Sequence, residues 1–576
     1  MSAPSEQQGR RIAVVGSGLA GLTAAHLLQK GGCQVELFEG ASSVGMDAGS
    51  LTVDNIRVDV PFRVMTPDYY PYLYGLYAYL GIKFTAADYS LGFADGSAET
   101  VWSYTNTLLG DTHVPIPDDI RCGARLVVSR EWLRMAFACV KVMRVPAALR
   151  PGGRLSHMTI GQYLSREQYD QLFVDRVFLP FIASMLTCSL HAASMYPATT
   201  ILHFVAKIVC GGRVRKAKNG VMEVCEHLTR GISKIHLSAL IDRIVLPDDG
   251  SGEQVLLATC DGQVHWFDQV VLATPADTAA RLLSGVRAKA GKKTAKGGAC
   301  PPGELLDALQ SVPYEDTSVF THRDVSVMPT RRDEWRGVNI RTADGERRAM
   351  ASHWINYVER TSTGRTLSTD VFQTVDPVVK LDAAKVISTS VFHRSLVTIE
   401  SQAHINTVHR HQGRNGVWLV GTYTSPGVPL LEGCVRTAVD VARAIVGAVP
   451  FEAPRLVRTS KAGEVYEVGL GPGMVRGEVV EAYFECDAAG TFAFARPTEP
   501  PAPAPRAGLA AWLRAWLAWL AFTVLLPVLA VLVSAADAGT CAVLGRDLGR
   551  RVQLAMLDVL VCVAWLAQLA YQWVAA

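Results

Sequence analysis

A glycine-rich turn near the N-terminus has the residue types and spacing of a dinucleotide site. Gly16, Gly18 and Gly21 follow the pattern G-x-G-x-x-G, and Glu39 stands 18 positions after the third glycine. The first glycine permits a tight turn, the second lets the backbone approach a pyrophosphate, and the third allows a helix to pack closely on a strand. A carboxylate at this separation reaches the ribose hydroxyls. The predicted site comprises Gly16, Ser17, Gly18, Ala20, Gly21 and Glu39.

The segments around this turn predict a β–α–β unit. Residues 11–15 (RIAVV) are rich in β-branched types and predict a buried strand, and residues 34–38 (QVELF) predict a second one. Residues 19–30 between them have a helical pattern that ends before Gly31. The N-terminus of this helix would offer free N–H groups and the positive end of its dipole to the pyrophosphate.

Composition limits the classes of protein to consider. The chain has 576 residues, of which 49% are apolar and 19% charged, and its formal net charge is +3. These values exclude a charge-rich disordered chain and predict no nucleic-acid partner. The 12 cysteines are scattered without the spacing of zinc ligands. We therefore predict no metal site and a reduced compartment.

The C-terminal part differs in character from the rest. Residues 497–508 form a proline-rich linker, and residues 515–536 contain no charged side chain. Such a stretch can cross a hydrocarbon core of about 30 Å. A second apolar stretch, residues 552–576, carries Asp558. We predict that 509–576 form two apolar helices that anchor the chain to a membrane, with the globular part facing the cytosol; a helical hairpin packed on the globular part is the alternative.

Other elements follow from hydrophobic periodicity and turn residues. Helices are predicted at 160–185, 194–209 and 432–446, and strands at 240–247, 254–260, 269–273 and 417–420.

Three further motifs accompany the glycine-rich turn. They are ASSVG at 41–45, LIDRI at 240–244 followed by VVLATP at 270–275, and VWLVGTYTSPGVPLLEGC at 417–434. With these motifs, residues 10–450 resemble the FAD-dependent amine oxidase and phytoene desaturase superfamily, in particular its amine-oxidase-like FAD-binding dehydrogenases of bacteria and fungi. The resemblance implies FAD as the cofactor.

The resemblance also implies roles for residues outside the glycine-rich turn. Gly45 would lie near the flavin phosphates, although the next residues are Met46 and Asp47 rather than the family's Gly-Arg. The backbone of Ile241 would contact the adenine, and Ala273 and Thr274 would lie beside the cofactor. In the last motif, Gly421 and Thr422 would approach the ribityl phosphate, and Leu431, Glu432 and Gly433 would begin a helix that faces the flavin pyrimidine.

We therefore predict an α/β fold with a discontinuous Rossmann-like FAD-binding domain, residues 10–65, 215–285 and 400–450. A mixed α+β substrate domain, residues 66–214 and 286–399, would be inserted into it. A small β-rich extension, residues 451–496, would precede the linker and the C-terminal hydrophobic helical hairpin.

The chemistry on the flavin is predicted from the same resemblance. Amine oxidases of the superfamily place an aromatic ring two residues before the Glu-Gly pair, where this chain has Leu430. The loop 424–429 resembles that of carotenoid desaturases instead. We therefore predict an oxidoreductase that transfers hydride between a lipidic or isoprenoid substrate and flavin N5. The electron acceptor is not predicted.

Two side chains are candidates for catalysis. His322, in a segment at 314–339 that also resembles the dehydrogenase-like proteins, is a candidate acid or base or else a structural hydrogen-bonding residue, and Tyr423 is a second candidate. Three alternative functions remain: a flavin-dependent fatty-acid double-bond isomerase, an amine oxidase, and a non-catalytic flavoprotein scaffold.

Overall fold

The computed structural model describes residues 9–451 with internal gaps, together with 457–459 and 465–467. The gaps are 46–49, 67–68, 88–89, 110–111, 118–137, 139–153, 209–213, 248–253, 291–302, 344 and 346. The predicted linker and the predicted membrane anchor lie outside the described residues. Within the described part of the chain, no helix combines the length and the apolar character needed to cross a membrane.

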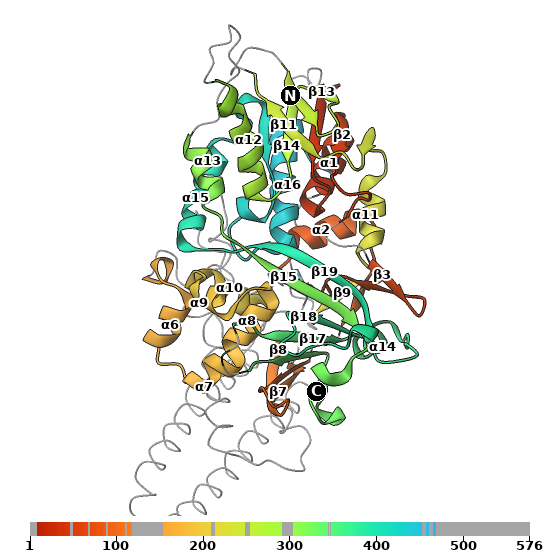
Figure 1. Ribbon diagram of the computed structural model, residues 1–576, viewed down its shortest axis with the longest axis vertical. Coiled ribbons are helices and arrows are strands. Elements are labelled where there is room, and N and C mark those ends of the chain that lie inside the picture. Colours follow the sequence, from red (N-terminus) through yellow and green to blue (C-terminus); the bar gives the residue numbers. More distant parts are fainter. Residues whose placement is uncertain are drawn as a thin grey trace, which may run out of the picture. The chain divides into compact units, whose positions relative to one another are not determined.

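A five-stranded parallel sheet forms the centre of the nucleotide-binding part (Figure 1). Its order is β10-β2-β1-β14-β20, and all four pairings are parallel. The strands come from three separated segments of the chain. Each strand contains Val, Ile or Leu, the residue types that favour a buried parallel strand. Their bounds are β1 Arg11–Val15, β2 Gln34–Phe38, β10 Lys234–His236, β14 Gln269–Leu272 and β20 Val417–Leu419.

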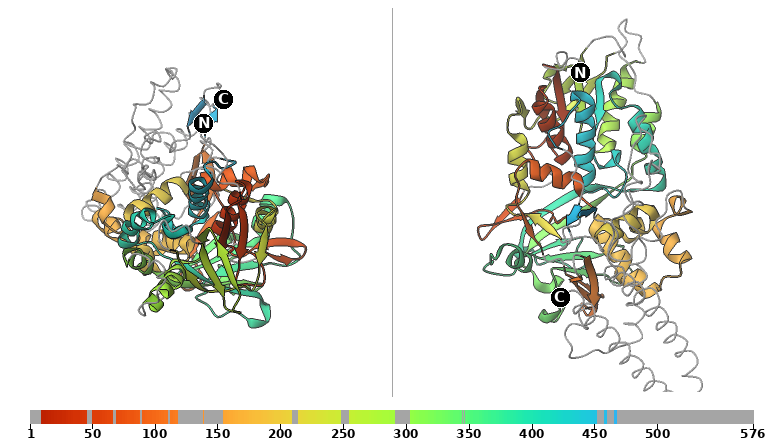
Figure 2. Two further views of the ribbon diagram at one scale, coloured as in Figure 1. Left: turned by 90° about the horizontal axis from the view of Figure 1, so that it is seen from above. Right: turned by 180° about the vertical axis from the view of Figure 1, so that it is seen from behind.

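Helices from both ends of the described chain pack together beside this sheet. Helix α1 (Leu19–Lys30) has ten consecutive buried residues, and α16 (Leu431–Val446) packs against it. The contact is close at Gly31, where an added Cβ would lie 2.7 Å from a methyl group of Val446. Helix α2 (Pro71–Tyr79) packs on α16, and α11 (Val221–Thr229) packs on α1 (Figures 1 and 2).

A three-stranded antiparallel sheet contributes to the core around β14. It consists of β11 (Ile241–Val245), β12 (Val255–Thr259) and β13 (Val264–Phe267). Ile244, Leu257 and Phe267 from this sheet share one buried cluster with Val270 and Leu272 of β14. The helices α12 (Ala276–Ala290), α13 (Gly303–Gln310) and α15 (Ile399–Arg410) complete this region.

A second, eight-stranded sheet has mixed direction. Its order is β19-β15-β18-β17-β16-β6-β7-β8, and only the β16–β6 pairing is parallel. The strand bounds are β6 Leu91–Ala94, β7 Thr100–Leu109, β8 Thr112–Pro117, β15 Tyr314–His322, β16 Val338–Arg341, β17 Met350–Trp354, β18 Phe372–Val375 and β19 Val386–Ser395. The fold is thus mixed α/β with a Rossmann-like part and several sheets.

The prediction of one continuous helix at 160–185 is wrong, because this segment is divided into shorter helices. The structure has α6 (Ile160–Arg166), α7 (Gln171–Phe173), a π-helical turn over Val174–Phe178 and α8 (Leu179–Leu186). The break follows from Gln168, whose φ is 52°, and from Asp170, whose side chain accepts the N–H of Leu172 and starts a new helix. The predicted helix at 194–209 corresponds to α10 (Ala198–Ile208), with α9 (Leu190–Met195) before it.

The remaining described elements are short. Apart from short 3₁₀ helices, they are β3 Ser50–Val53, β4 Ile56–Asp59, β5 Phe84–Ala86, β9 Arg215–Ala217, α14 Ile355–Thr363, β21 Val457–Thr459 and β22 Val465–Glu467. The last two form an antiparallel pair within the predicted β-rich extension.

Candidate cofactor site

The three predicted motifs meet at one edge of the parallel sheet. Gly16 follows β1, Ala273 follows β14 and Gly421 lies just beyond β20, and β14 is the neighbour of both other strands. Adjacent strands are about 4.8 Å apart, so the turns at Gly16 and Gly421 begin about 10 Å from each other. Ligands of open α/β sheets bind at this carboxyl edge.

The first glycine-rich turn needs glycine for two physical reasons. Gly16 has a φ of +102°, and a Cβ there would lie 2.8 Å from the carbonyl oxygen of Ala273. A Cβ on Gly21 would collide with the carbonyl oxygen of Gly16. Because neither position carries a Cβ, α1 can pack tightly against β1 and β14, and the helix begins directly at the edge of the sheet.

Gly18 differs from its two partners. It is the N-cap of α1, its φ is −61°, and a Cβ placed there would meet no atom within 4 Å. No side chain caps this helix end within the described structure. Uncapped N–H groups beside open space form an anion site, and the residues here therefore fit a pyrophosphate.

Glu39 is held at the same turn. Its carboxylate accepts the backbone N–H of Ser17 at 2.8 Å, the Ser17 hydroxyl at 2.5 Å and the N–H of Ala41 at 2.9 Å. The Ser17 hydroxyl in turn accepts the N–H of Gly45 at 3.2 Å. The predicted residues Ser17, Glu39 and Gly45 are therefore neighbours, while Ala20 is buried in α1 and contributes packing.

The strand residues predicted beside the cofactor reach the same place. Ala273 donates its N–H to the carbonyl of Val15, and the hydroxyl oxygen of Thr274 is buried without a hydrogen-bond partner among the described residues. An unpartnered buried hydroxyl fits a polar ligand at this position. Ile241 is buried on β11, two residues after Ala239, whose N–H donates to the carbonyl of Glu39.

The second glycine motif forms a turn on the start of α16. Gly421 has a φ of +144° and donates its N–H to the hydroxyl of Thr437, one turn after Gly433 on α16. A Cβ on Gly433 would lie 3.2 Å from Cβ of Ser425, so the glycine allows the 422–425 turn to pack on the helix. Thr437 was not predicted, although its position four residues after Gly433 places both on one helix face.

The helix start at Leu431 is confirmed, and Glu432 has a defined partner. Its two carboxylate oxygens accept the N–H groups of Tyr72 and Leu73, at 2.9 and 3.0 Å, so that Glu432 caps α2 from a distant part of the chain. Burial raises the pKa of Glu432 to about 7, although these two N–H groups and Arg436 favour its ionised form. Glu432 thus connects the start of α16 to α2.

Of the two catalytic candidates, His322 is buried and Tyr423 is half-buried. His322 ends β15 in the eight-stranded sheet, where its Nε2 lies 2.8 Å from the hydroxyl of Thr374 and its Nδ1 accepts the N–H of Asp324. Burial lowers the pKa of His322 to about 4. These contacts favour the structural interpretation of His322 over an acid or base.

Tyr423 follows Gly421 and packs against the core cluster of the nucleotide-binding part. Its hydroxyl is buried without a partner in the described structure, and burial raises its pKa well above the usual value. Tyr423 therefore lies at the site but is not poised as a proton donor.

A cleft of about 630 Å³ lies away from these motifs. It is lined by residues that include Ser189, Phe320 and Arg347, and Arg348 forms ion pairs there with Glu315 and Asp376. This charged lining does not fit a hydrocarbon chain.

Comparison with known proteins is consistent with this geometry. Residues 14–80 match the family model of the NAD(P)-binding Rossmann-like domain. No protein of curated function matches the sequence. In structure, the chain is similar to cyclohexylamine oxidase from Brevibacterium oxydans IH-35A, with a TM-score of 0.53, 14% identity, and coverage of 76% of this chain and 99% of that one.

Putrescine oxidase bound to putrescine is similar too. Its TM-score is 0.50 at 15% identity, and the match covers 76% of this chain and 99% of that structure. At this level of sequence identity, the structural similarity shows a shared fold and nothing finer. The chain therefore shares the fold of these two oxidases over about three quarters of its length.

Proposed function

We propose that the protein is an FAD-dependent oxidoreductase, anchored to a membrane, that transfers hydride between a lipidic or isoprenoid substrate and flavin N5. One observation carries the flavin part: three turns from segments up to 405 positions apart lie at a single sheet edge. The bound flavin would supply the two-electron chemistry. The protein's own residues bind and orient the two partners.

The glycine-rich turn would hold the diphosphate. The N–H groups at the start of α1 face open space beside Gly18, and Glu39 offers a carboxylate to ribose hydroxyls. When a ribose is bound, its hydroxyls can compete with Ser17 for this carboxylate. A positioned carboxylate already held by N–H groups loses little conformational entropy on binding.

The second motif supports FAD over a nicotinamide nucleotide alone. A nicotinamide-binding unit needs the glycine-rich turn and the acidic residue, both of which lie within residues 14–80. Here the turn at Gly421 and the start of α16 are added at the same edge. The positive end of a helix dipole at that point favours negative charge on a reduced flavin ring.

The lipidic substrate is supported by the apolar C-terminal sequence and by Leu430, whereas α2 contributes core packing. The apolar residues 509–576 would hold the enzyme at a bilayer, so that the substrate need not cross water. The tyrosines of α2 mostly pack: Tyr77 is fully buried, and Tyr74 stacks on Phe84 at 4.5 Å. Leu430 adds an apolar side chain before α16 where an amine oxidase of the superfamily has a ring.

A visible spectrum of the full chain purified in detergent tests the cofactor. We expect flavin absorbance that disappears on reduction, and a preparation that neither carries flavin nor takes up FAD would contradict the proposal. Substrate class is tested by lipid extraction and mass spectrometry of the same preparation. Peroxide formation with monoamines or putrescine, without any effect of lipid, would instead establish amine oxidation.

A further inference from the structure

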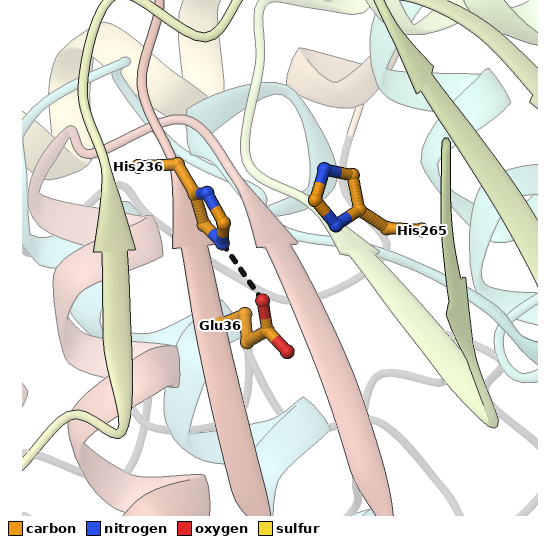
Figure 3. A group of neighbouring side chains, drawn as sticks. All are labelled: Glu36, His236 and His265. Atoms are coloured by element: carbon orange, nitrogen blue, oxygen red, sulfur yellow. Dashed lines mark hydrogen bonds and ion pairs between the residues drawn. The ribbon is translucent and has the colours of Figure 1, made fainter. Parts of the chain in front are cut away.

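Three potential metal ligands meet outside the cofactor site. Glu36 extends from β2, His236 from the neighbouring β10, and His265 from β13 of the three-stranded sheet (Figure 3). One ligand atom from each lies within 4.8 Å of the other two, and Nε2 of His236 is 2.7 Å from a carboxylate oxygen of Glu36. No local sequence pattern indicates this group, because 200 positions separate the first two residues.

Aromatic packing fixes both imidazole rings. His236 stacks on Phe38 with ring centroids 4.3 Å apart and an interplanar angle of 4°. His265 contacts the edge of Phe38 at 5.1 Å and stacks near Phe267 at 6.4 Å. The two imidazoles are themselves 5.1 Å apart. Because packing already restricts both rings, they would lose little side-chain freedom on binding an ion between them.

The hydrogen bonds around the group leave capacity for a cation. Nε2 of His265 is buried and has no hydrogen-bond partner among the described residues. Arg11 donates to Oε1 of Glu36 at 3.1 Å, whereas Oε2 faces His236. Arg11 therefore orients the carboxylate as an outer partner would, although its positive charge reduces the attraction for a metal ion.

We propose that Glu36, His236 and His265 bind a zinc-type divalent metal ion. Two imidazole nitrogens and one carboxylate oxygen are a donor set that Zn²⁺ takes, with a water in the fourth position. The site is half-buried, since the side chains of His236 and Glu36 are 12% and 16% exposed, so that water can reach it. The ion would connect β13 to the parallel sheet and stabilise the folded chain.

Zinc binding to the full-length protein, first stripped with a chelator, tests this proposal. We expect one Zn²⁺ per chain by calorimetry and metal analysis, and a rise in the melting temperature. His236→Phe and His265→Phe keep the aromatic packing and should weaken binding by about tenfold or more. His393→Phe is the matched control, because His393 also stacks on an aromatic ring and faces carboxylates, yet lies elsewhere.

Two results of the zinc measurements would overturn the proposal. One is wild-type protein that binds no stoichiometric Zn²⁺, and the other is either phenylalanine variant binding Zn²⁺ as tightly as the His393→Phe control. If those variants do not fold, Cu²⁺ bound to the wild-type chain provides a separate readout. Its electron paramagnetic resonance spectrum should show coupling to two imidazole nitrogens, and a spectrum without them overturns the site.

Discussion

Glu39 and Ser17 are joined by two hydrogen bonds, one from the backbone N–H at 2.8 Å and one from the hydroxyl at 2.5 Å. The carboxylate at the end of β2 is thereby fixed over the glycine-rich turn that follows β1. These two hydrogen bonds orient the carboxylate, so its contribution to cofactor binding can be measured by substitution.

Glu39→Gln should weaken FAD binding by about tenfold, because hydrogen bonds to a charged acceptor are worth roughly 1.5–3 kcal/mol and the amide loses the charge. Titration of the chain stripped of flavin, followed by quenching of flavin fluorescence, measures the dissociation constant. Asp242→Asn, on the exposed side of β11, is the control and should bind as the wild type does. Equal affinities of both variants would remove Glu39 from the site.

Gly18→Ala and Gly21→Ala should separate binding from folding. The Cβ at position 18 enters open space where the ligand is expected, so the flavin-free protein should keep its melting temperature while FAD affinity falls. The Cβ at position 21 collides with the backbone of Gly16, so the second variant should unfold at lower temperature even without flavin. An equal loss of stability in both would contradict this reading of the turn.

Glu432 should make stability depend on pH. Its pKa is about 7 in the folded chain and near 4.5 when exposed, so the folded state binds the proton more tightly. The stability it contributes is therefore fully present below pH 4.5 and is lost as the pH rises to about 7, by at most about 1.4 kcal/mol per pH unit.

Glu432→Gln should remove this dependence. Urea unfolding between pH 4.5 and 8 measures it as the difference between variant and wild type, and Glu400→Gln, an exposed change on α15, provides the control. A difference that stays constant over this range would contradict the raised pKa.

His322→Ala should destabilise the fold by about 2 kcal/mol, because it leaves the buried Thr374 hydroxyl without one of its partners. FAD content and affinity should not change. Chemical unfolding and the flavin spectrum of the same preparation measure the two effects. If the variant instead keeps wild-type stability and loses turnover, His322 acts as an acid or base and the structural interpretation is wrong.

Membrane attachment can be tested on the full chain with two substitutions, Leu525→Arg and Leu529→Arg. Each arginine in the middle of an apolar span costs about 3 kcal/mol on insertion scales. The variant should leave the membrane fraction on carbonate extraction, and a chain with isoleucine at both positions should stay. Equal extraction of both would exclude residues 515–536 as the anchor.

The sequence predicts those elements whose pattern is local. Residues 11–15, 19–30 and 34–38 are β1, α1 and β2 without any shift of their ends, because β-branched runs, the glycine turn and Gly31 mark each boundary. The convergence of Gly16, Ala273 and Gly421 follows from the motifs once parallel pairing is assumed, and the structure has that pairing.

Features that depend on contacts between distant residues cannot be predicted from local sequence patterns. The cap that Glu432 provides to α2 spans 360 positions, and no pattern around Glu432 indicates Tyr72 as its partner. The helix breaks near Gln168, whose φ is positive, and the helical periodicity of the sequence gives no sign of this break. Asp170, a residue type that favours the N-cap, is the one local signal of it. The strand β13 is not predicted, because it has only four residues and His265 interrupts its apolar side chains.

The arrangement of the parallel sheet also bears on biosynthesis. Strand β20 is the edge strand beside β14 and is followed by α16. The last part of the candidate site, the turn at Gly421, therefore lies more than 400 residues after the glycine-rich turn at Gly16. A nascent chain on the ribosome therefore displays the glycine-rich turn long before the partner loop has been translated. Coenzyme capture must wait until translation has passed Val446.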